Sequence, residues 1–445
     1  MGVLTMIAQL ILSLSILVVL HELGHFLPAK WFKTRVEKFY LFFDVKFSLL
    51  KKKIGETEYG IGWLPLGGYV KIAGMVDESM DLEQMKQPAQ PWEFRSKPAW
   101  QRLIIMIGGV TVNFLLGFLI FGMMLWGYGK EYLDNTKLEY GIYADSLGVA
   151  MGFQDGDKIQ SIGGEAVKEF SPGMLRKEIV LNNAKQIILS RGDGEVTLYV
   201  EPHYVQVLSS NDYKDYAIVG PRIPFVVGKV TDGGNAARAG LLKDDEVIYV
   251  NNLPGTYQHE VVKLLSKFKS QTVRLGILRA GVQSEIPVEV DENGRIGIGL
   301  KGPVEFGWTG REDYTLAQAI PGGFTEGVDF IADWFKGIAQ LFKGKVKAKD
   351  SLGGFITITK LFSTTWDWES FWRITGILSF ILAIMNLLPI PALDGGHVIF
   401  LLYEVFTGKK PSDKVMEYST YVGFAIILGL LILANGLDIM RLFGK

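Results

Sequence analysis

The 445-residue sequence has no cysteine, only five histidines and almost no net charge, with a formal value of −1 at pH 7. The absence of cysteine excludes disulfides, thiolate metal sites and cysteine nucleophiles. The balanced charge gives no sign of a nucleic-acid-binding surface, so we expect no nucleic-acid partner. Any metal site in this chain must therefore use histidine and carboxylate side chains.

Hydrophobic residues are abundant, at 48% of the chain. Four segments contain apolar runs long enough to cross a bilayer, and we predict transmembrane helices at 1–30, 103–128, 371–403 and 417–438. Lysine and arginine cluster after the first helix and between the last two. The positive-inside rule therefore places both regions in the cytoplasm and residues 129–373 outside. The first segment lacks a basic start and a small-residue cleavage site, so we expect it to be retained.

The first apolar run ends in the sequence His21-Glu22-Leu23-Gly24-His25. On a helix, His21 and His25 are four residues apart and project from one face, where two imidazoles can bind one Zn²⁺. This motif also occurs by chance on solvated helices, but ionisable groups beside a membrane span are costly and typical of function. We therefore predict zinc as cofactor, His21 and His25 as ligands, and Glu22 as the catalytic residue.

The third apolar run supplies a candidate third ligand. Asn386 is followed by Pro389 and Pro391, which should break the helix, and then by Asp394. The predicted topology puts Asp394 and the two histidines at the cytoplasmic ends of their helices. Two histidines and one carboxylate, with one position left open, is the composition of a catalytic zinc site. His397 could compete with Asp394, but we expect it to support the site instead.

Residues 31–102, between the first two helices, combine apolar alternation with glycine breaks and end in a polar linker. This pattern predicts β-hairpins that lie on the membrane or re-enter it. A sheet edge beside the metal could bind an extended substrate segment by strand addition, with contacts from Gly67 and Gly68. Alternatively, the sheet only holds the helices together. Asn113, in the second helix, either forms a hydrogen bond between helices or contacts the substrate. Asn386, Pro389 and Pro391 are further candidate substrate contacts.

Residues 150–164 match residues 238–252 at an offset of 88, which indicates two copies of one small β-rich domain. We place the copies at 138–205 and 222–300. They resemble the PDZ domains of bacterial proteases, which bind peptides at a strand edge and usually have glycine where the second copy has Asp244. His203 and His259 lie in these copies, and we expect both to be ordinary polar residues. Residues 305–370 are predicted to be an amphipathic helical segment that lies on the membrane or below the two copies.

Taken together, the motifs resemble those of the site-2 protease family of intramembrane zinc metalloproteases, in its bacterial form with tandem PDZ domains. The matching motifs are HELGH at 21–25, PLGGYVK at 65–71 and NLLPIPALDGG at 386–396. One departure is Gly109, where relatives often carry proline. The resemblance implies a multi-pass α-helical membrane protein with four transmembrane helices, a membrane-associated β-hairpin region and two extracytoplasmic PDZ-like α+β domains.

For function, the resemblance implies regulated intramembrane proteolysis in the bacterial cytoplasmic membrane. Such enzymes cut single-span membrane proteins already shortened by another protease, such as anti-sigma factors, and some remove signal-peptide remnants. The PDZ pair would then act outside as a size filter, with the active site near the cytoplasmic side. One alternative is a non-enzymatic membrane scaffold with a structural metal. A second is a metal-ion transporter, which would need more polar residues along its helices.

Overall fold

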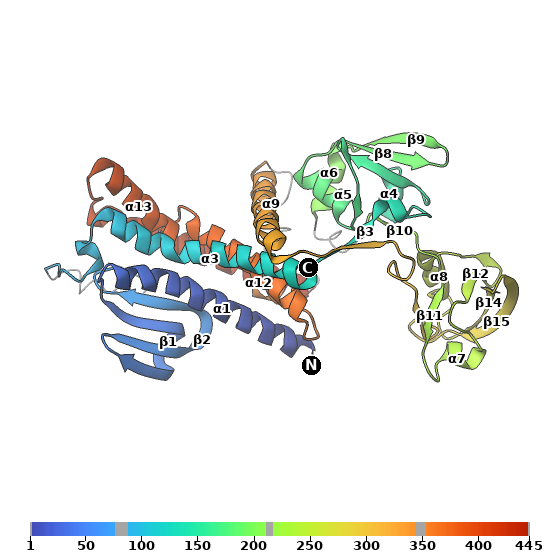
Figure 1. Cartoon of the computed structure of the whole chain (residues 1–445), viewed down its shortest axis with the longest axis horizontal. Helices are drawn as coiled ribbons and strands as arrows, with labels where there is room; N and C mark the ends of the chain where they lie inside the picture. Colours follow the sequence, from blue (N-terminus) through green and yellow to red (C-terminus); the bar gives the residue numbers. More distant parts are fainter. Residues whose placement is uncertain (1, 76–87, 211–216, 344–352, 444–445) are drawn as a thin grey trace. The chain divides into compact units, whose positions relative to one another are not determined.

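The computed structural model describes residues 2–75, 88–210, 217–343 and 353–443, which divide into two compact units (Figure 1). The helical unit consists of Met1–Gly129, Asp313–Ala332 and Leu352–Lys445. The β-rich unit consists of Lys130–Glu312 and Asp333–Ser351. Most of the predicted linker between the sheet and the second helix, and part of the predicted segment 305–370, lie outside the described residues.

The helical unit is built from long helices and one pair of long strands. Its elements are α1 (Gly2–Trp31), β1 (Val36–Ile54), β2 (Thr57–Ile72), η1 (Phe94–Ser96), α3 (Ala99–Tyr128), α11 (Phe355–Thr359), α12 (Trp368–Leu387), α13 (Asp394–Thr407) and α14 (Asp413–Leu442). Helix α9 (Leu316–Phe342) belongs to this unit as far as Ala332 and to the β-rich unit beyond it.

Among the described residues, four helices are long and apolar enough to cross a membrane: α1, α3, α12 and the part of α14 from Lys414 to Leu442. The chain is therefore a membrane protein. Within the predicted segment 371–403, helix α12 ends at Leu387 and α13 begins only at Asp394. Pro389 and Pro391 account for this break, because proline has no N–H to donate and disfavours helical geometry in the residue before it.

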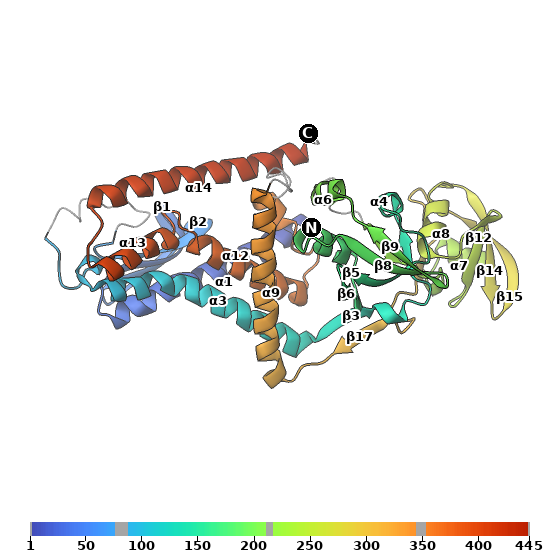
Figure 2. The ribbon, with the colours of Figure 1, turned by 90° about the horizontal axis from the view of Figure 1, so that it is seen from above.

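Helices α1, α3 and α12 run alongside one another (Figure 2). Aromatic side chains fill the contact between α3 and α12: the ring centroid of Phe380 lies 4.9 Å from that of Phe118 and 5.3 Å from that of Phe121. Gly117 of α3 leaves room for this packing, since a Cβ there would lie 2.7 Å from the Phe380 ring. Small residues of this kind let transmembrane helices approach closely.

The predicted amphipathic segment 305–370 is not helical throughout. It begins with strand β17 (Thr309–Glu312), which pairs with β3 (Lys130–Asp134) of the β-rich unit. Residues Thr309–Glu312 form this strand and helix α9 begins only at Leu316. The predicted helical segment, which started at residue 305, therefore extended too far towards the N-terminus. Helix α9 then follows, and within the helical unit Gly323 packs on Gly122 of α3, where a Cβ on Gly323 would collide with the backbone.

Strands β1 and β2 are bent, so that together they form a sheet with several paired segments. Residues 50–54 pair with 57–61, whereas residues 38–41 pair with 68–71 and also lie beside 58–61. Within the described part of the chain, no other strand pairs with residues 68–72, so this segment is a sheet edge.

The β-rich unit contains two four-stranded sheets with the same strand order, β6-β5-β8-β9 and β13-β12-β14-β15. Their equivalent strands β5 (Lys158–Ile162) and β12 (Glu246–Val250) begin 88 residues apart, the offset of the sequence repeat. The remaining elements are η2 (Asn135–Lys137), β4 (Ile142–Ala144), α4 (Ser146–Ala150), β6 (Glu165–Ala166), β7 (Glu169–Phe170), α5 (Met174–Arg176), η3 (Lys177–Leu181), β8 (Gln186–Arg191), β9 (Gly194–Tyr199), α6 (Pro202–Ser209), β10 (Val219–Pro221), β11 (Val227–Val230), α7 (Asn235–Ala239), β13 (Leu253–Pro254), α8 (Gln258–Leu265), β14 (Thr272–Arg279), β15 (Val282–Glu289) and β16 (Ile298–Leu300).

Both copies contain the same buried ion pair, which we call the Asp–Arg clamp. In the first copy Arg191 donates to both carboxylate oxygens of Asp157 at 2.8 Å. In the second copy Arg279 donates to both oxygens of Asp245 at 2.7 Å. The two aspartates are 1% and 0% exposed, so each clamp holds a buried charge with paired hydrogen bonds.

Candidate metal centre

The structure brings together His21, His25 and Asp394, which come from helix α1 and the start of α13. The two Nε2 atoms lie 3.2 Å apart. Asp394 Oδ2 lies 3.3 Å from Nε2 of His21 and 3.3 Å from Nε2 of His25. The three donor atoms therefore form a nearly equilateral triangle, although Asp394 follows His25 by 369 positions in the sequence.

The triangle has the size that a zinc ion requires. In a tetrahedral site with bonds of about 2.0–2.1 Å, neighbouring ligand atoms are about 3.3–3.4 Å apart. Asp394 Oδ2 is buried and has no hydrogen-bond partner among the described residues, so it is left to face a cation. The donor set, two imidazole nitrogens and one carboxylate oxygen, matches the chemistry of a catalytic zinc site with one open position.

The two histidines reach this geometry because α1 and α3 cross with their backbones in contact. At the crossing, Gly24 of α1 faces Gly108 of α3, and a Cβ on either residue would collide with the other's backbone. Gly109 lies directly against the histidine rings: a Cβ there would collide with Nε2 of His25 and lie 2.7 Å from Cε1 of His21. In the sequence, Gly109 was noted only as a departure from the proline of relatives, and its position at a helix crossing was not predicted.

Asp394 is placed by the tight loop between α12 and α13. Ala392 in this loop has a φ of +92°, an unusual value for a residue with a side chain. A Cβ on Gly395 or Gly396 would collide with the loop backbone, at Leu388 and Ile390 respectively. The Asp-Gly-Gly sequence thus lets the loop fold back over the first turn of α13 with Asp394 at its start.

Hydrogen bonds fix the orientation of both imidazole rings. Nδ1 of His25 donates to the carbonyl oxygen of Ile105 at 2.8 Å, which leaves Nε2 free for a metal. The side-chain amide of Asn113 lies 3.1 Å from Nδ1 of His21, and Asn113 is fully buried. Asn113 thus contacts a histidine from behind the site, and its predicted contact with substrate stays a prediction.

Glu22 is half-buried beside the triangle and next to the sheet edge. Its carboxylate lies near both histidines and the backbone of Val70. Gly68, in the same edge segment, packs on α1: a Cβ there would collide with Val18 and lie 3.7 Å from Cγ of Glu22. The free edge of the sheet is therefore adjacent to the predicted catalytic residue.

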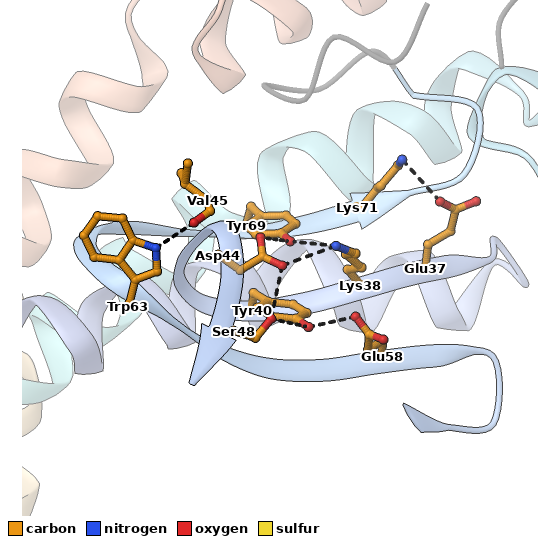
Figure 3. A network of polar contacts seen from close by, with 10 residues as sticks. All are labelled: Glu37, Lys38, Tyr40, Asp44, Val45, Ser48, Glu58, Trp63, Tyr69 and Lys71. Carbon is orange, nitrogen blue, oxygen red and sulfur yellow. Dashed lines mark hydrogen bonds and ion pairs between the residues drawn. The ribbon is translucent and has the colours of Figure 1, made fainter. Parts of the chain in front are cut away.

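A polar and aromatic network holds the edge segment in place (Figure 3). The hydroxyl of Tyr69 donates to Asp44 at 2.8 Å, and the ammonium of Lys38 pairs with the same carboxylate at 3.4 Å. Burial alone would raise the pKa of Asp44, but these two partners hold it below its usual value. Tyr69 also stacks on Tyr40, with ring centroids 5.4 Å apart.

The other predicted residues lie around this centre. The amide nitrogen of Asn386 is 3.3 Å from Nε2 of His21, close to the position that a metal would take. Pro389 and Pro391 lie in the loop before Asp394, and Gly67 lies against the ring of Phe43. His397 is half-buried and is not a member of the triangle. Their roles towards substrate stay predictions.

Comparison with known proteins identifies the family to which this chain belongs. The sequence signature described as Peptidase family M50 matches residues 9–430, nearly the whole chain. The chain belongs to peptidase family M50, the site-2 protease family. This M50 peptidase is similar to proteins named "Putative zinc metalloprotease" from three bacteria.

Sequence identity to these relatives is below one third, but each match covers nearly the full length of both chains. The Treponema pallidum protein is 28% identical, over 97% of this chain and 98% of its own. The Borreliella burgdorferi protein is 29% identical, over 96% of each chain. The Rickettsia conorii protein is 28% identical, over 97% of this chain and 98% of its own. The M50 peptidase described here is thus a zinc-dependent metalloprotease of the membrane, which confirms the predicted cofactor.

Proposed function

We propose that this M50 peptidase is an intramembrane zinc endopeptidase that cuts the transmembrane segment of single-span membrane proteins. The observation that carries the proposal is the His21–His25–Asp394 triangle, formed by helices of an apolar bundle and adjacent to Glu22. The substrates we propose are proteins already shortened outside, of the anti-sigma factor type, and signal-peptide remnants.

In this proposal His21, His25 and Asp394 hold the zinc. When bound, the ion supplies a Lewis acid that acidifies water and polarises the scissile carbonyl. Glu22 accepts the proton of the attacking water and later delivers it to the leaving amine nitrogen. Asn113 and the Ile105 carbonyl keep the two imidazoles in position.

Substrate binding is proposed for the free edge at residues 68–72. A transmembrane helix hides its carbonyls in its own hydrogen bonds, so it must unwind before it is cut. An extended segment that pairs with this edge would replace those lost hydrogen bonds and lie next to Glu22. The alternative, a sheet that only supports the helices, predicts that edge substitutions leave cleavage unchanged.

We also propose the surroundings of the enzyme. The lysine and arginine distribution favours an orientation with residues 129–373 outside and the metal centre towards the cytoplasm, and the bacterial relatives point to a bacterial cytoplasmic membrane. The two repeated β-rich copies would then be PDZ-like domains on the outer side. There they would exclude substrates that still carry a bulky outer domain.

The test compares the wild type with Glu22→Gln after zinc has been quantified in both purified proteins. Each is incubated with a single-span peptide that lacks an outer domain. We expect equal zinc content, cleavage by the wild type, and a loss of about 10²–10⁴-fold in the variant, the usual contribution of a general acid–base. Cleavage at the wild-type rate by Glu22→Gln would overturn the proposed role of Glu22.

A further inference from the structure

A second group of potential metal ligands lies in the β-rich unit, apart from the centre described above. Asp155, His259 and Glu260 have ligand atoms that all lie within 4.8 Å of one another. Asp155 precedes strand β5 of the first copy, whereas His259 and Glu260 belong to the first turn of α8 in the second copy. The sequence alone gave no reason to regard His259 as more than an ordinary polar residue.

Both carboxylates of this group are anchored through one oxygen. Oδ1 of Asp155 accepts from the backbone N–H of Ala144 at 2.9 Å. Oε2 of Glu260 accepts from the backbone N–H groups of Thr256 and Tyr257 at 3.0 and 3.2 Å. The other oxygen of each carboxylate faces Nε2 of His259, at 3.4 Å for Asp155 and 3.9 Å for Glu260. Three potential ligand atoms thus face one another, and the backbone bonds to the opposite carboxylate oxygens would remain if a cation bound, whereas Oε1 of Glu260 also accepts from Arg222 at 3.3 Å.

The imidazole of His259 is also held. Its ring stacks on Tyr143, with centroids 4.3 Å apart and an interplanar angle of 11°. Its Nδ1 is buried and has no hydrogen-bond partner in the described part of the chain, so Nε2 is the nitrogen available to a ligand. Nε2 of His259 faces both carboxylates, so it either donates its N–H to Asp155 at 3.4 Å or, once deprotonated there, shares a metal ion with the two carboxylates.

Arg222 already neutralises part of the charge, since its guanidinium lies 3.3 Å from Oε1 of Glu260. It also stacks on Tyr257 at 3.8 Å, a contact that does not depend on Glu260. With a neutral imidazole, two carboxylates and one guanidinium leave a charge of −1, which still attracts a cation.

We propose that Asp155, His259 and Glu260 bind a second zinc ion that joins the two repeated copies. A ligand set of imidazole and carboxylates favours zinc over calcium or magnesium. The separation of 3.4 Å between His259 and Asp155 already suits the edge of about 3.3–3.4 Å expected for tetrahedral zinc, but the 3.9 Å between His259 and Glu260 exceeds it, so Glu260 must move inward to close the site. Binding is therefore weaker than at the buried triangle. Because the ligands come from both copies, the ion would fix the orientation of one copy to the other.

The test counts zinc in the full-length protein. Chelator-stripped protein in detergent is first equilibrated with excess zinc. It is then exchanged into a buffer that holds the free zinc concentration constant, and the bound zinc is counted by elemental mass spectrometry. We expect two zinc ions per chain in the wild type, one in His259→Ala and one in Asp394→Ala. His203→Ala is the matched control and should keep two, because this exposed histidine contacts Glu201 at 3.3 Å and the Tyr204 ring, and it belongs to no candidate metal group among the described residues.

A wild type that binds one zinc ion, or a His259→Ala variant that still binds two, would overturn the proposal. Asp155→Asn provides an independent variant in case His259→Ala folds poorly, and circular dichroism checks both folds. Zinc should also slow hydrogen exchange in α8 and in the turn at Asp155 in the wild type but not in Asp155→Asn. Equal exchange with and without zinc would equally overturn the proposal. None of these readouts depends on protease activity.

Discussion

The helical unit and the β-rich unit position their charged groups in opposite ways. In the helical unit, three ligands from distant parts of the sequence meet once, at a glycine crossing and a tight loop. In the β-rich unit, the Asp–Arg clamp occurs twice and joins residues 34 apart in each copy. In the proposed function the unique arrangement carries the chemistry, so changes there should remove function. The duplicated arrangement carries stability, so changes there should affect one copy and leave the other intact.

The largest expected effect is that of Asp394→Ala. Loss of one vertex of the triangle should lower zinc affinity by more than about 100-fold, because even supporting residues of a metal site contribute about 10–100-fold. Cleavage should be lost with the metal. Zinc content and peptide cleavage measure both effects. Glu369→Ala in α12, which removes an exposed ion pair with Arg373, is the control and should change neither. Full zinc content and activity in Asp394→Ala would refute its role as third ligand.

Gly109→Ala tests whether the helix crossing creates the site. The added methyl group would meet Nε2 of His25 and Cε1 of His21, so the rings must move out of the triangle. We expect weaker zinc binding and at least about a tenfold loss of cleavage, since small displacements at a reacting centre are costly. Gly127→Ala in the same helix is the matched control, because a Cβ there has no atom within 4 Å. Wild-type zinc affinity in Gly109→Ala would show that the crossing tolerates a side chain.

In the β-rich unit, Asp157→Asn and Asp245→Asn should each destabilise one copy by about 2–4 kcal/mol, because each breaks a buried charge pair. Hydrogen exchange should accelerate in β5 and β8 for the first variant and in β12 and β14 for the second. Faster hydrogen exchange in both copies of either variant would show that the two copies unfold together, and would contradict the expectation that each change affects one copy.

The second clamp should also depend on pH. Burial alone would raise the pKa of Asp245, but the hydrogen bonds from Arg279 and Leu242 lower it below its usual value. The stabilisation is therefore fully present above the unfolded pKa of about 4 and is lost as the pH falls through the lower folded value. Hydrogen exchange in β12 and β14 between pH 5 and pH 3 measures this loss, which Asp245→Asn should abolish.

The sequence predicted the parts of this architecture that depend on local rules. The spacing of His21 and His25 and the prolines before Asp394 each carry a local signal, and the structure brings the three ligands together. The Asp–Arg clamps were missed, although Asp157 and Asp245 share the repeat offset with Arg191 and Arg279. The contact of Gly109 with the histidine rings was not predictable, because it depends on how two helices cross. The Asp155–His259 contact likewise depends on how the two copies pack.

The smallest expected effect distinguishes the two copies at a single turn. Gly156 has a φ of +92° in the first copy, and its counterpart Asp244 has a φ of +72°, in the left-handed region. Asp244 also pairs with Lys301 at 2.6 Å, an ion pair that offsets part of the strain although Asp244 is largely exposed to solvent.

Glycine adopts this conformation freely, whereas other residues lose about 1–2 kcal/mol there. Asp244→Gly should therefore change the free energy of unfolding by less than about 0.5 kcal/mol, and Gly156→Ala should lower it by about 1–2 kcal/mol. Local hydrogen exchange measures the change in unfolding free energy for each substitution. An equal loss of stability for the two would mean that the two turns differ in more than the identity of this residue.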